Sequence, residues 1–417
     1  MRLPIIFIIF LVIIAVFADW YIIRDIKKYI PVQKRRIWKI AYLVSMFIGY
    51  GIILAIFCIP VRDEQSDIIP VMWLLYSFLS LYIPKLIYLV CSVVGKICGI
   101  FYRRFRRFNN SRKRNYGVYA GIFFAVVSFF YLWWGVLFTR NHIEVNQVTV
   151  SSAKLPASFS GYKIVQLSDI HVGTWGDNTG FVEELVEEVN SLKPDLIVFT
   201  GDIVNRRTEE LRPFLNVLSK LKAKDGVYSV LGNHDYGDYI DWKTEEEHKK
   251  NNELLAQWEK DMGWHLLKNE SVILKKGKDS IVLIGVENWG EPPFPAYGQL
   301  KSSYPGNKSK TGNLNDSKFK ILLTHNPEHW NREVKKITNI DLSLSGHTHA
   351  MQMMLSIGGW HWSPSVFKYP NWGGLYKDKS RMGEPMYLYV NIGAGEVGMP
   401  SRLGSAYPEI TEIILKK

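Results

Sequence analysis

Four long apolar stretches constrain this chain more than any other feature of its sequence. They are Leu3 to Ile23, Trp38 to Ile59, Ile69 to Val94 and Tyr116 to Phe138. A helix needs about 20 mostly apolar residues to cross a bilayer, and each stretch is long enough. The first could instead be a cleaved signal peptide, but it has neither a marked basic start nor a small-residue cleavage site. We therefore expect an all-α transmembrane region of four helices.

The third stretch is the weakest of the four, because Pro84 and Lys85 interrupt it. Ionisable groups at membrane depth are costly and often functional. A lysine beside a proline at a helix break can also reach the membrane surface or line a cleft between helices, and we favour this structural interpretation. No internal repeat suggests a transporter.

The charges of the chain divide between its two ends. Residues 1–138 contain 18 Lys and Arg against 5 Asp and Glu, whereas the remaining residues contain 33 and 34. The basic excess therefore lies in loops beside the apolar stretches, and we expect no nucleic-acid partner.

The same loops predict the orientation in the membrane. Basic residues cluster after the first stretch, from Arg24 to Lys39, and after the third, from Lys96 to Arg114, so both loops should be cytoplasmic. The connection Arg62 to Asp67 is acidic on balance and suits the opposite face. Four spans then put Arg140 and the following residues on that face. We predict a multi-pass protein of the cell membrane with an extracytoplasmic second domain.

A change of composition near Arg140 marks the domain boundary. We expect a transmembrane region at residues 1–140 and a second domain at residues 147–417. The three cysteines, Cys58, Cys91 and Cys98, all belong to the first part. The second domain therefore has neither a disulfide framework nor a cysteine-based metal site.

Short β-rich runs alternate with amphipathic helical stretches in the second domain, which predicts an α/β core. The expected helices are Phe181 to Asn190, Glu210 to Leu221 and the charged run Glu245 to Lys260. The expected strands are Tyr162 to Leu167, Leu196 to Thr200, Val227 to Leu231, Lys320 to Thr324 and Leu342 to Ser345. Ligands of such sheets gather at the carboxyl ends of the strands.

Each expected strand ends in a cluster that contains a potential metal ligand. The clusters are Ser168-Asp169-Ile170-His171, Gly201-Asp202, Gly232-Asn233-His234-Asp235, Thr324-His325-Asn326 and Gly346-His347-Thr348-His349. A single histidine of this kind is more often a buried, hydrogen-bonded core residue, but five clusters in phase favour a metal site. Carboxylates and imidazoles without thiolates suit Mn, Fe or Zn. Two such ions about 3.5 to 4 Å apart can polarise a phosphoryl group and activate water, so the pattern predicts phosphoester hydrolysis.

The five clusters resemble the motifs of the calcineurin-like metallophosphoesterase family, in which D-x-H, G-D, G-N-H-D/E, a single H and G-H-x-H occur in this order. The resemblance extends from Ile164 through the closing stretch Asn391 to Leu415, and is greatest to a membrane-associated bacterial branch with G-N-H-D-Y and L-S-G-H-T-H motifs. It implies a two-sheet sandwich flanked by helices. It says nothing about the four spans.

The resemblance also implies roles for particular residues. Two divalent metal ions would be held, one by Asp169, His171, Asp202 and His349, the other by Asp202, Asn233, His325 and His347. Asp202 would then bridge the ions, and a hydroxide bound between them would attack phosphorus. His234 would contact the phosphoryl oxygen and protonate the leaving group, with Asp235 orienting its imidazole. Arg402 lies where relatives have an arginine near the site, and a guanidinium can bind phosphate, so it is a candidate for substrate binding.

One departure from the family pattern concerns the last motif. Many relatives continue it as G-H-T-H-G-G-Q, whereas this chain has Ala350 and Met351 before Gln352. We expect a less permissive loop beside the site. All the metal ligands are present, so we do not infer inactivity.

The sequence therefore predicts a hydrolase of phosphomonoesters, phosphodiesters or pyrophosphates. Its substrate would be a phosphorylated small molecule or a lipid, because a membrane tether raises the local concentration of a membrane-borne substrate. The alternative is a receptor or scaffold that keeps the fold and binds phosphorylated ligands without turnover. A transporter with this domain as an accessory is a weaker third interpretation. The oligomeric state is not assigned.

Overall fold

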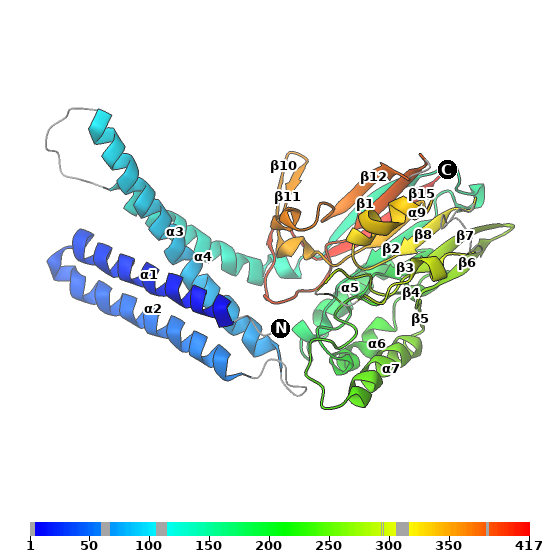
Figure 1. Cartoon of the computed structure of the whole chain (residues 1–417), viewed down its shortest axis with the longest axis horizontal. Helices are drawn as coiled ribbons and strands as arrows, with labels where there is room; N and C mark the ends of the chain where they lie inside the picture. The colour runs from blue at the N-terminus through cyan, green and yellow to red at the C-terminus, as the bar shows by residue number, and fades with distance from the viewer. Residues whose placement is uncertain are drawn as a thin grey trace. The chain divides into compact units, whose positions relative to one another are not determined.

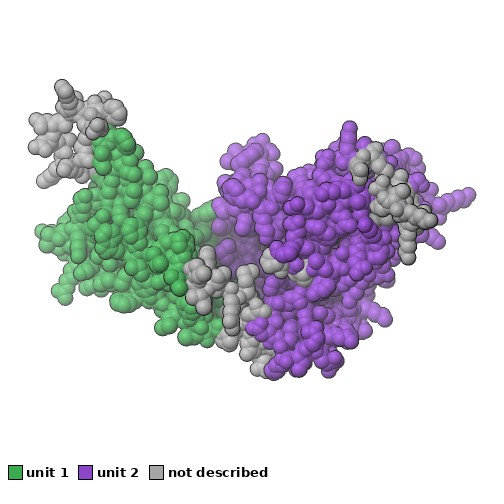
Figure 2. All heavy atoms as spheres, viewed as in Figure 1, with its two compact units in different colours: residues 1–137 green, residues 138–417 purple. Residues whose placement is uncertain are grey.

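The computed structural model describes residues 5–59, 67–105, 115–292, 294, 296–305, 317–380 and 383–417. Residues 62–66 of the acidic connection and 106–114 of the second basic loop, on which the predicted orientation partly rests, lie outside these ranges. The chain divides into two compact units, Met1–Leu137 and Phe138–Lys417 (Figure 2).

The first unit is helical, as the apolar stretches predict. It contains α1 (Ile5–Tyr29), α2 (Val32–Cys58), α3 (Ile69–Phe105) and α4 (Tyr116–Leu137). Among the described residues, α2, α3 and α4 contain segments that are long and apolar enough to span a membrane. Pro84 lies within α3 and does not end it, so the expected break at this position does not occur.

Lys85 forms an ion pair inside this unit. Its Nζ atom lies 3.0 Å from Oδ1 of Asp19 on α1, and the exposed fractions of the two residues are 8% and 2%. The hydroxyl groups of Tyr50 and Tyr82 donate to the other carboxylate oxygen at 2.9 Å. The carboxylate is thus paired with one ammonium and several hydroxyl groups from α2 and α3, as a buried charge requires. This arrangement supports the structural interpretation of Lys85.

Lys85→Met is expected to destabilise the first unit by about 3 to 5 kcal/mol, because it leaves the Asp19 carboxylate buried without its cation. The measurement is the thermal unfolding midpoint of the full chain in detergent. Lys39→Met, which removes an exposed lysine of α2, is the matched control. The double variant Lys85→Met/Asp19→Asn should recover part of the loss, and an unchanged midpoint in the single variant would contradict the assigned role.

The second unit is built on two six-stranded mixed sheets (Figure 1). The first sheet has the order β1 (Glu144–Ser151), β15 (Glu409–Lys416), β2 (Lys163–Leu167), β3 (Leu196–Phe199), β4 (Val227–Ser229), β5 (Trp264–Leu266). The second has the order β12 (Gly374–Lys379), β13 (Pro385–Val390), β9 (Leu342–Ser345), β8 (Lys320–Leu323), β7 (Asp279–Gly285), β6 (Glu270–Lys276). A small third sheet contains β11 (Trp360–Trp362), β10 (Met353–Ile357) and β14 (Leu403–Gly404).

The central strands are apolar on both faces because both faces are covered. Alternate residues such as Leu196 and Val198 of β3 and Ile321 and Leu323 of β8 pack together between the two large sheets. The intervening residues pack outward against helices. On the first sheet these are α5 (Gly180–Ser191) and α7 (Glu245–Asp261); on the second they include α8 (Leu300–Ser303) and the π-helix η5 (Trp330–Val334). The predicted two-sheet sandwich flanked by helices is confirmed.

One of the predicted helices is wrong in type. The stretch Glu210 to Leu221 forms mainly a 3-10 helix, η4 (Thr208–Phe214), followed by a single turn, α6 (Leu215–Leu218). Pro213 lies inside η4, where its missing N–H and its ring disfavour a regular α-helix. The other two predicted helices correspond to α5 and α7, and α7 begins at a capping box formed by Thr244 and Glu247.

Strand direction brings the ligand-bearing loops together. Strands β2, β3 and β4 run parallel in one sheet, and β7, β8, β9 and β13 run parallel in the other. Their carboxyl ends therefore supply loops to one edge of the sandwich.

Candidate metal centre

The predicted ligands stand on strained turns that begin where the strands end. Five of the seven have left-handed backbone, with φ between 46° and 75°: Asp169, His171, Asp202, His347 and His349. Residues with side chains rarely adopt this region, and each such residue costs of order 1 to 3 kcal/mol unless its surroundings hold it in place. All five belong to the loops at the site, so the strain is concentrated where side chains must converge.

Small residues make this convergence possible. A Cβ atom on Gly346 would overlap Oγ of Ser168 and a carboxylate oxygen of Asp169, and one on Gly232 would overlap the Asp202 side chain. The glycines therefore do more than provide loop flexibility. They let main chain and ligand carboxylates lie in direct contact.

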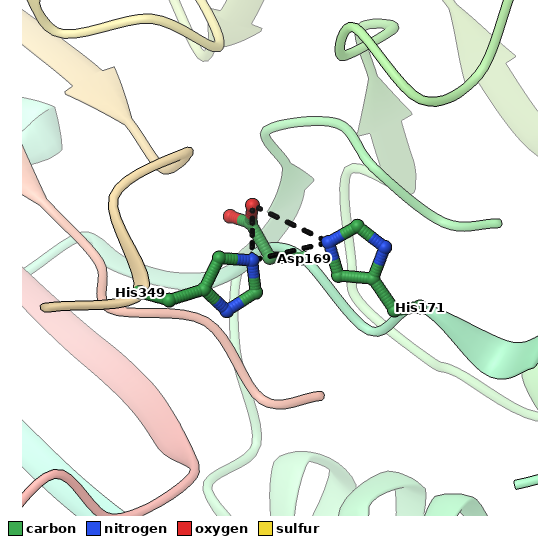
Figure 3. Close-up of side chains that lie close together, drawn as sticks. All are labelled: Asp169, His171 and His349. Carbon is green, nitrogen blue, oxygen red and sulfur yellow. Dashed lines mark hydrogen bonds and ion pairs between the residues drawn. The ribbon is translucent and has the colours of Figure 1, made fainter. Parts of the chain in front are cut away.

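Asp169, His171 and His349 form the first group of potential ligands (Figure 3). Nε2 of His349 lies 3.2 Å from Oδ1 of Asp169, and Nε2 of His171 lies 4.0 Å from the same oxygen. The two Nε2 atoms are 3.1 Å apart. Asp169 and His171 follow β2 of the first sheet and His349 follows β9 of the second, so both sheets build this group.

Asp202, His325 and His347 form the second group. Nε2 of His325 lies 3.1 Å from Oδ2 of Asp202 and 3.1 Å from Nδ1 of His347. The same Asp202 oxygen lies 3.7 Å from Nε2 of His171, in the first group. The Asp202 carboxylate therefore lies between the two groups.

The far nitrogens of these imidazoles fix which nitrogen carries the proton. Nδ1 of His171 donates to the carbonyl oxygen of Val204 at 3.1 Å, and Nδ1 of His325 donates to that of Thr200 at 2.8 Å. A carbonyl only accepts, so in the neutral ring Nε2 keeps its lone pair. Imidazoles that bind metals are usually oriented by such a hydrogen bond from the opposite nitrogen.

The pKa values divide the groups into ionised carboxylates and mainly neutral imidazoles. Burial lowers the pKa of His171 well below its usual value and, with His325 nearby, lowers that of His347 to about 3. Burial opposes ionisation of Asp202, yet the neighbouring His325 holds its pKa well below the usual range. Burial also lowers the pKa of His325, but the charges of Asp202 and Asp169 outweigh it and raise the value to about 9. The two carboxylates thus attract positive charge. The proton on His325 supplies part of it, and bound divalent cations would take the place of that proton.

Asn233 provides a direct test of whether a cation fits. Its Nδ2 donates to the hydroxyl of Tyr239 at 2.8 Å, whereas its Oδ1 is buried and has no hydrogen-bond partner among the described residues. The next main-chain N–H, that of His234, donates to Oδ1 of Asp202 at 2.8 Å, which ties Asn233 to the second group. A buried acceptor without a partner is costly unless something else binds it. The donor set, oxygen and imidazole nitrogen without sulfur, therefore suits divalent metal ions.

His234 lies beside the first group, with its ring centroid 4.8 Å from that of His171. Nδ1 of His234 lies 2.6 Å from the carbonyl oxygen of Asn205 and donates to it. The ring is partly exposed, and its Nε2 has no hydrogen-bond partner among the described residues. This nitrogen is thus free to exchange a proton with a bound molecule.

Asp235 does not orient His234 as the sequence predicted. Its carboxylate instead accepts hydrogen bonds from main-chain N–H groups at 2.7 to 2.9 Å: those of Asp202, Ile203 and Gly232. Asp235 is buried under two tight turns whose N–H groups have no strand partner, and it satisfies them. Its role is to hold the loop that carries Asp202.

Arg402 is also placed differently from the expectation. The residue is fully buried, and its guanidinium donates to the main-chain carbonyls of Ile392, Gly393, Gly395, Ala406 and Tyr407. All of its donors are therefore engaged by the chain itself, so it is not positioned to bind substrate. It braces the loop after β13, whose Gly395 N–H donates to the Asp169 carbonyl at 2.8 Å.

Sequence reasoning did not identify Tyr239 as a site residue, and it named Tyr369 only as one of several aromatic residues around the site. Tyr239 holds the Asn233 amide and packs on the His234 ring, with centroids 4.5 Å apart. The hydroxyl of Tyr369 lies 2.9 Å from Nε2 of His347. Tyr239 follows the G-N-H-D-Y motif closely, and this proximity is the one signal that could have drawn attention to it.

The two residues at which the last motif departs from the family pattern also adopt left-handed backbone. Ala350 and Met351 have φ of 50° and 48°, in the 3-10 turn η6 (His349–Gln352). A side chain in this region costs about 1 to 2 kcal/mol. The loop next to His349 therefore contains strained backbone. That this loop is less permissive toward substrates stays a prediction.

Met351→Gly is expected to stabilise the chain by about 0.5 to 1 kcal/mol, because relief of the strained φ outweighs the greater freedom of glycine in the unfolded chain. The unfolding midpoint should rise by roughly 2 °C. Gly277, which has φ of 64° and open space around its Cβ position, provides the reverse control: Gly277→Ala should lower the midpoint. A lower midpoint for Met351→Gly would refute the strain argument.

Comparison with known proteins gives consistent matches over both units. A family model described as "Calcineurin-like phosphoesterase" matches residues 162–351, and one described as "Probable Calcineurin-like phosphoesterase, transmembrane domain" matches residues 1–140. A transmembrane protein with metallophosphoesterase domain from Danio rerio is 28% identical over 93% of this chain and 82% of its own length. The uncharacterized metallophosphoesterase YkuE of Bacillus subtilis is 30% identical over 66% of this chain and 86% of its own length. An uncharacterized metallophosphoesterase of Campylobacter jejuni is 27% identical over 92% of each chain.

Proposed function

The chain belongs to the calcineurin-like phosphoesterase family, and from this membership we propose that its second unit hydrolyses a phosphoester or pyrophosphate bond with two divalent metal ions. The observation that carries the proposal is the pair of ligand groups with the Asp202 carboxylate between them, next to an Asn233 oxygen that lacks a partner. Mn, Fe and Zn all suit these donors.

Each ligand has a defined part in this proposal. One ion would be held by Asp169, His171, Asp202 and His349, and the other by Asp202, Asn233, His325 and His347. When bound, the two cations would supply positive charge that polarises the phosphoryl group and would make water a better nucleophile near neutral pH. Val204 and Thr200 contribute through their carbonyls, which accept the Nδ1–H groups of His171 and His325 and so leave the Nε2 lone pairs for the metals.

His234 is the proposed proton donor. Its Nδ1–H is held by the Asn205 carbonyl, and this bond orients the ring beside His171. Protonated at Nε2, the ring would first donate a hydrogen bond to a phosphoryl oxygen and then transfer the proton to the leaving oxygen. Tyr239 packs against this ring and limits its rotation.

A panel of substrates tests the proposed reaction. Full-length protein loaded with Mn should hydrolyse at least one of bis(p-nitrophenyl) phosphate, p-nitrophenyl phosphate, a nucleotide pyrophosphate or phosphatidic acid in mixed micelles. The relative rates assign the bond type and show whether the substrate is a small molecule or a lipid. Folded, metal-loaded protein without activity on any of them would favour the phospho-ligand receptor instead.

The protein is an integral membrane protein by its transmembrane domain. We further propose that it is a multi-pass protein of the cell membrane with its catalytic unit outside the cytoplasm, because the basic loops should remain inside. Alkaline phosphatase fused after Lys417 should then be active in a bacterial host, and a green fluorescent protein fused there should remain dark. The reverse pattern would overturn the orientation.

A further inference from the structure

Large exposed apolar side chains of the second unit gather in one segment. Among the described residues of this unit, ten such side chains are exposed, and seven of them lie between Met351 and Leu375. The most exposed are Phe367 (85%), Ile357 (71%) and Trp360 (57%). We call β10, β11 and the following turn η7 (Pro364–Phe367) the apolar hairpin, residues 353–367. Single exposed apolar residues are ordinary on protein surfaces, but a cluster of this kind marks an interaction surface.

The apolar hairpin is amphipathic, with one unpartnered face. Its register pairs Leu355 with Trp362 and Ile357 with Trp360, so these four side chains share one face. Phe367 extends this face, because its ring contacts that of Trp362 at a centroid distance of 6.3 Å.

The opposite face of the hairpin is polar and internally paired. Oγ of Ser356 lies 2.8 Å from Nδ1 of His361 and 2.6 Å from Oγ of Ser405, which follows β14. Ser356 and His361 are exposed as well, so both faces of the hairpin are open to the surroundings, one polar and one apolar. Figure 1 shows β10 and β11 projecting from the body of the second unit.

The charge pattern of the segment indicates which partner this is. Residues 342–377 contain no Asp or Glu, and the stretch 351–376 contains one charged residue, Lys368. Its ammonium lies over the ring of Tyr369 at 5.1 Å. Exposed Trp, Phe and Ile without acidic neighbours, flanked by one lysine, are the residues that settle at the boundary between lipid headgroups and acyl chains. A water-exposed protein interface would more often carry a mixed polar rim.

Chain connectivity tethers the apolar hairpin to the end of a candidate membrane span. Its strand β10 pairs with β14, and β14 contacts η1 (Thr139–Asn141) within the second unit. The first residue of η1 follows the last residue of α4 by two positions, which allows at most about 7 Å of extended chain. Because α4 is a candidate membrane span, the sheet that carries the hairpin is tethered at the point where the chain leaves the lipid.

We propose that the apolar hairpin docks into the surface of the bilayer that α4 spans, with Ile357, Trp360 and Phe367 among the lipid headgroups and upper acyl chains. The turn η6 joins the ligand His349 directly to β10, so docking fixes the metal centre near the membrane surface. The site would then favour phosphoesters carried by the bilayer, an extension that rests on the proposed hydrolase function.

Site-directed spin labelling of the full chain tests the docking. A nitroxide is attached at Ile357→Cys in protein whose Cys58, Cys91 and Cys98 are replaced by alanine, and the protein is reconstituted into phosphatidylcholine–phosphatidylglycerol nanodiscs. Ile273→Cys is the matched control, because Ile273 of β6 is also an isoleucine and is 51% exposed. The label at 357 should be more accessible to oxygen than to a water-soluble nickel chelate, whereas the label at 273 should show the opposite preference.

Two outcomes would overturn the proposal. A label at 357 that is as accessible to the nickel chelate as the control lies in water, and a label that is immobilised but shielded from both reagents lies against protein. A label at Phe367→Cys provides a second reading if the first variant fails to fold. None of these signals depends on turnover, so docked protein without activity on any substrate of the panel would contradict the proposed hydrolysis and leave the docking intact.

Discussion

Asp202→Ala is expected to abolish turnover and to remove metal from both groups at once. Its Oδ2 lies 3.1 Å from Nε2 of His325 and 3.7 Å from Nε2 of His171, so one substitution removes a ligand from each proposed ion. Replacing residues that only support ligands typically weakens metal affinity by about 10- to 100-fold, and loss of a shared ligand should exceed this range. The measurement is metal content by mass spectrometry together with hydrolysis of the best substrate of the panel.

The control for this variant is Asp261→Asn, at an exposed position on α7 where the side chain accepts a hydrogen bond from Gln257. It should retain full metal content and turnover. Retention of two metals and activity by Asp202→Ala would show that this carboxylate does not bridge. Loss of metal from only one group would restrict Asp202 to a single ion.

His234→Gln is expected to lower turnover by about 10²- to 10⁴-fold while leaving metal content unchanged, because His234 is proposed to move a proton and not to bind metal. The loss should be larger for an alkyl leaving group, which needs protonation, than for p-nitrophenolate, which does not. Comparison of the two esters therefore separates proton donation from a general effect on the fold.

The matched control is His265→Gln, an exposed histidine on β5 that should behave as the parent. Equal losses for both leaving groups would assign His234 to phosphate binding only. If the parent and His234→Gln bound phosphorylated ligands equally well and neither turned them over, the receptor interpretation would replace the enzyme.

The sequence predicted the central strands of the α/β core well because their information is local, whereas the two-sheet arrangement came from the family resemblance. Each central strand is a short apolar run that needs no distant contact to be recognised, as in Leu196 to Phe199. Each run is followed by a polar cluster that contains a potential metal ligand. Parallel strands bring these clusters to one edge of the sheet. The exception, Glu210 to Leu221, was also decided locally, by the proline at 213.

The supporting contacts of the site could not be predicted in the same way. Asp235 lies next to His234 in sequence, yet it binds the N–H of Asp202, 33 positions away. A guanidinium such as that of Arg402 can bind phosphate, but here main-chain carbonyls of the surrounding loops accept hydrogen bonds from all its donors. Such contacts depend on how turns that are distant in sequence pack against one another. Residue type and spacing do not predict that packing.

The apolar hairpin was hidden for a different reason. The sequence alone does not separate core packing, a membrane-facing rim and substrate contact for aromatic residues such as Trp360 and Trp362, and it does not single out Ile357. The three-dimensional structure was needed to show that Ile357 and Trp360 share one exposed face of the hairpin.

Each ligand group contains residues from both sheets, so the site forms only when the two halves of the domain are packed together. Asp169 and His349 are contributed by strands of different sheets, as are Asp202 and His325. A chain with one half misfolded offers only part of each ligand group, which binds a cation more weakly. Metal content would therefore measure the fraction of molecules in which both sheets have assembled correctly. Bound ions would in turn stabilise the packing of the two sheets against each other.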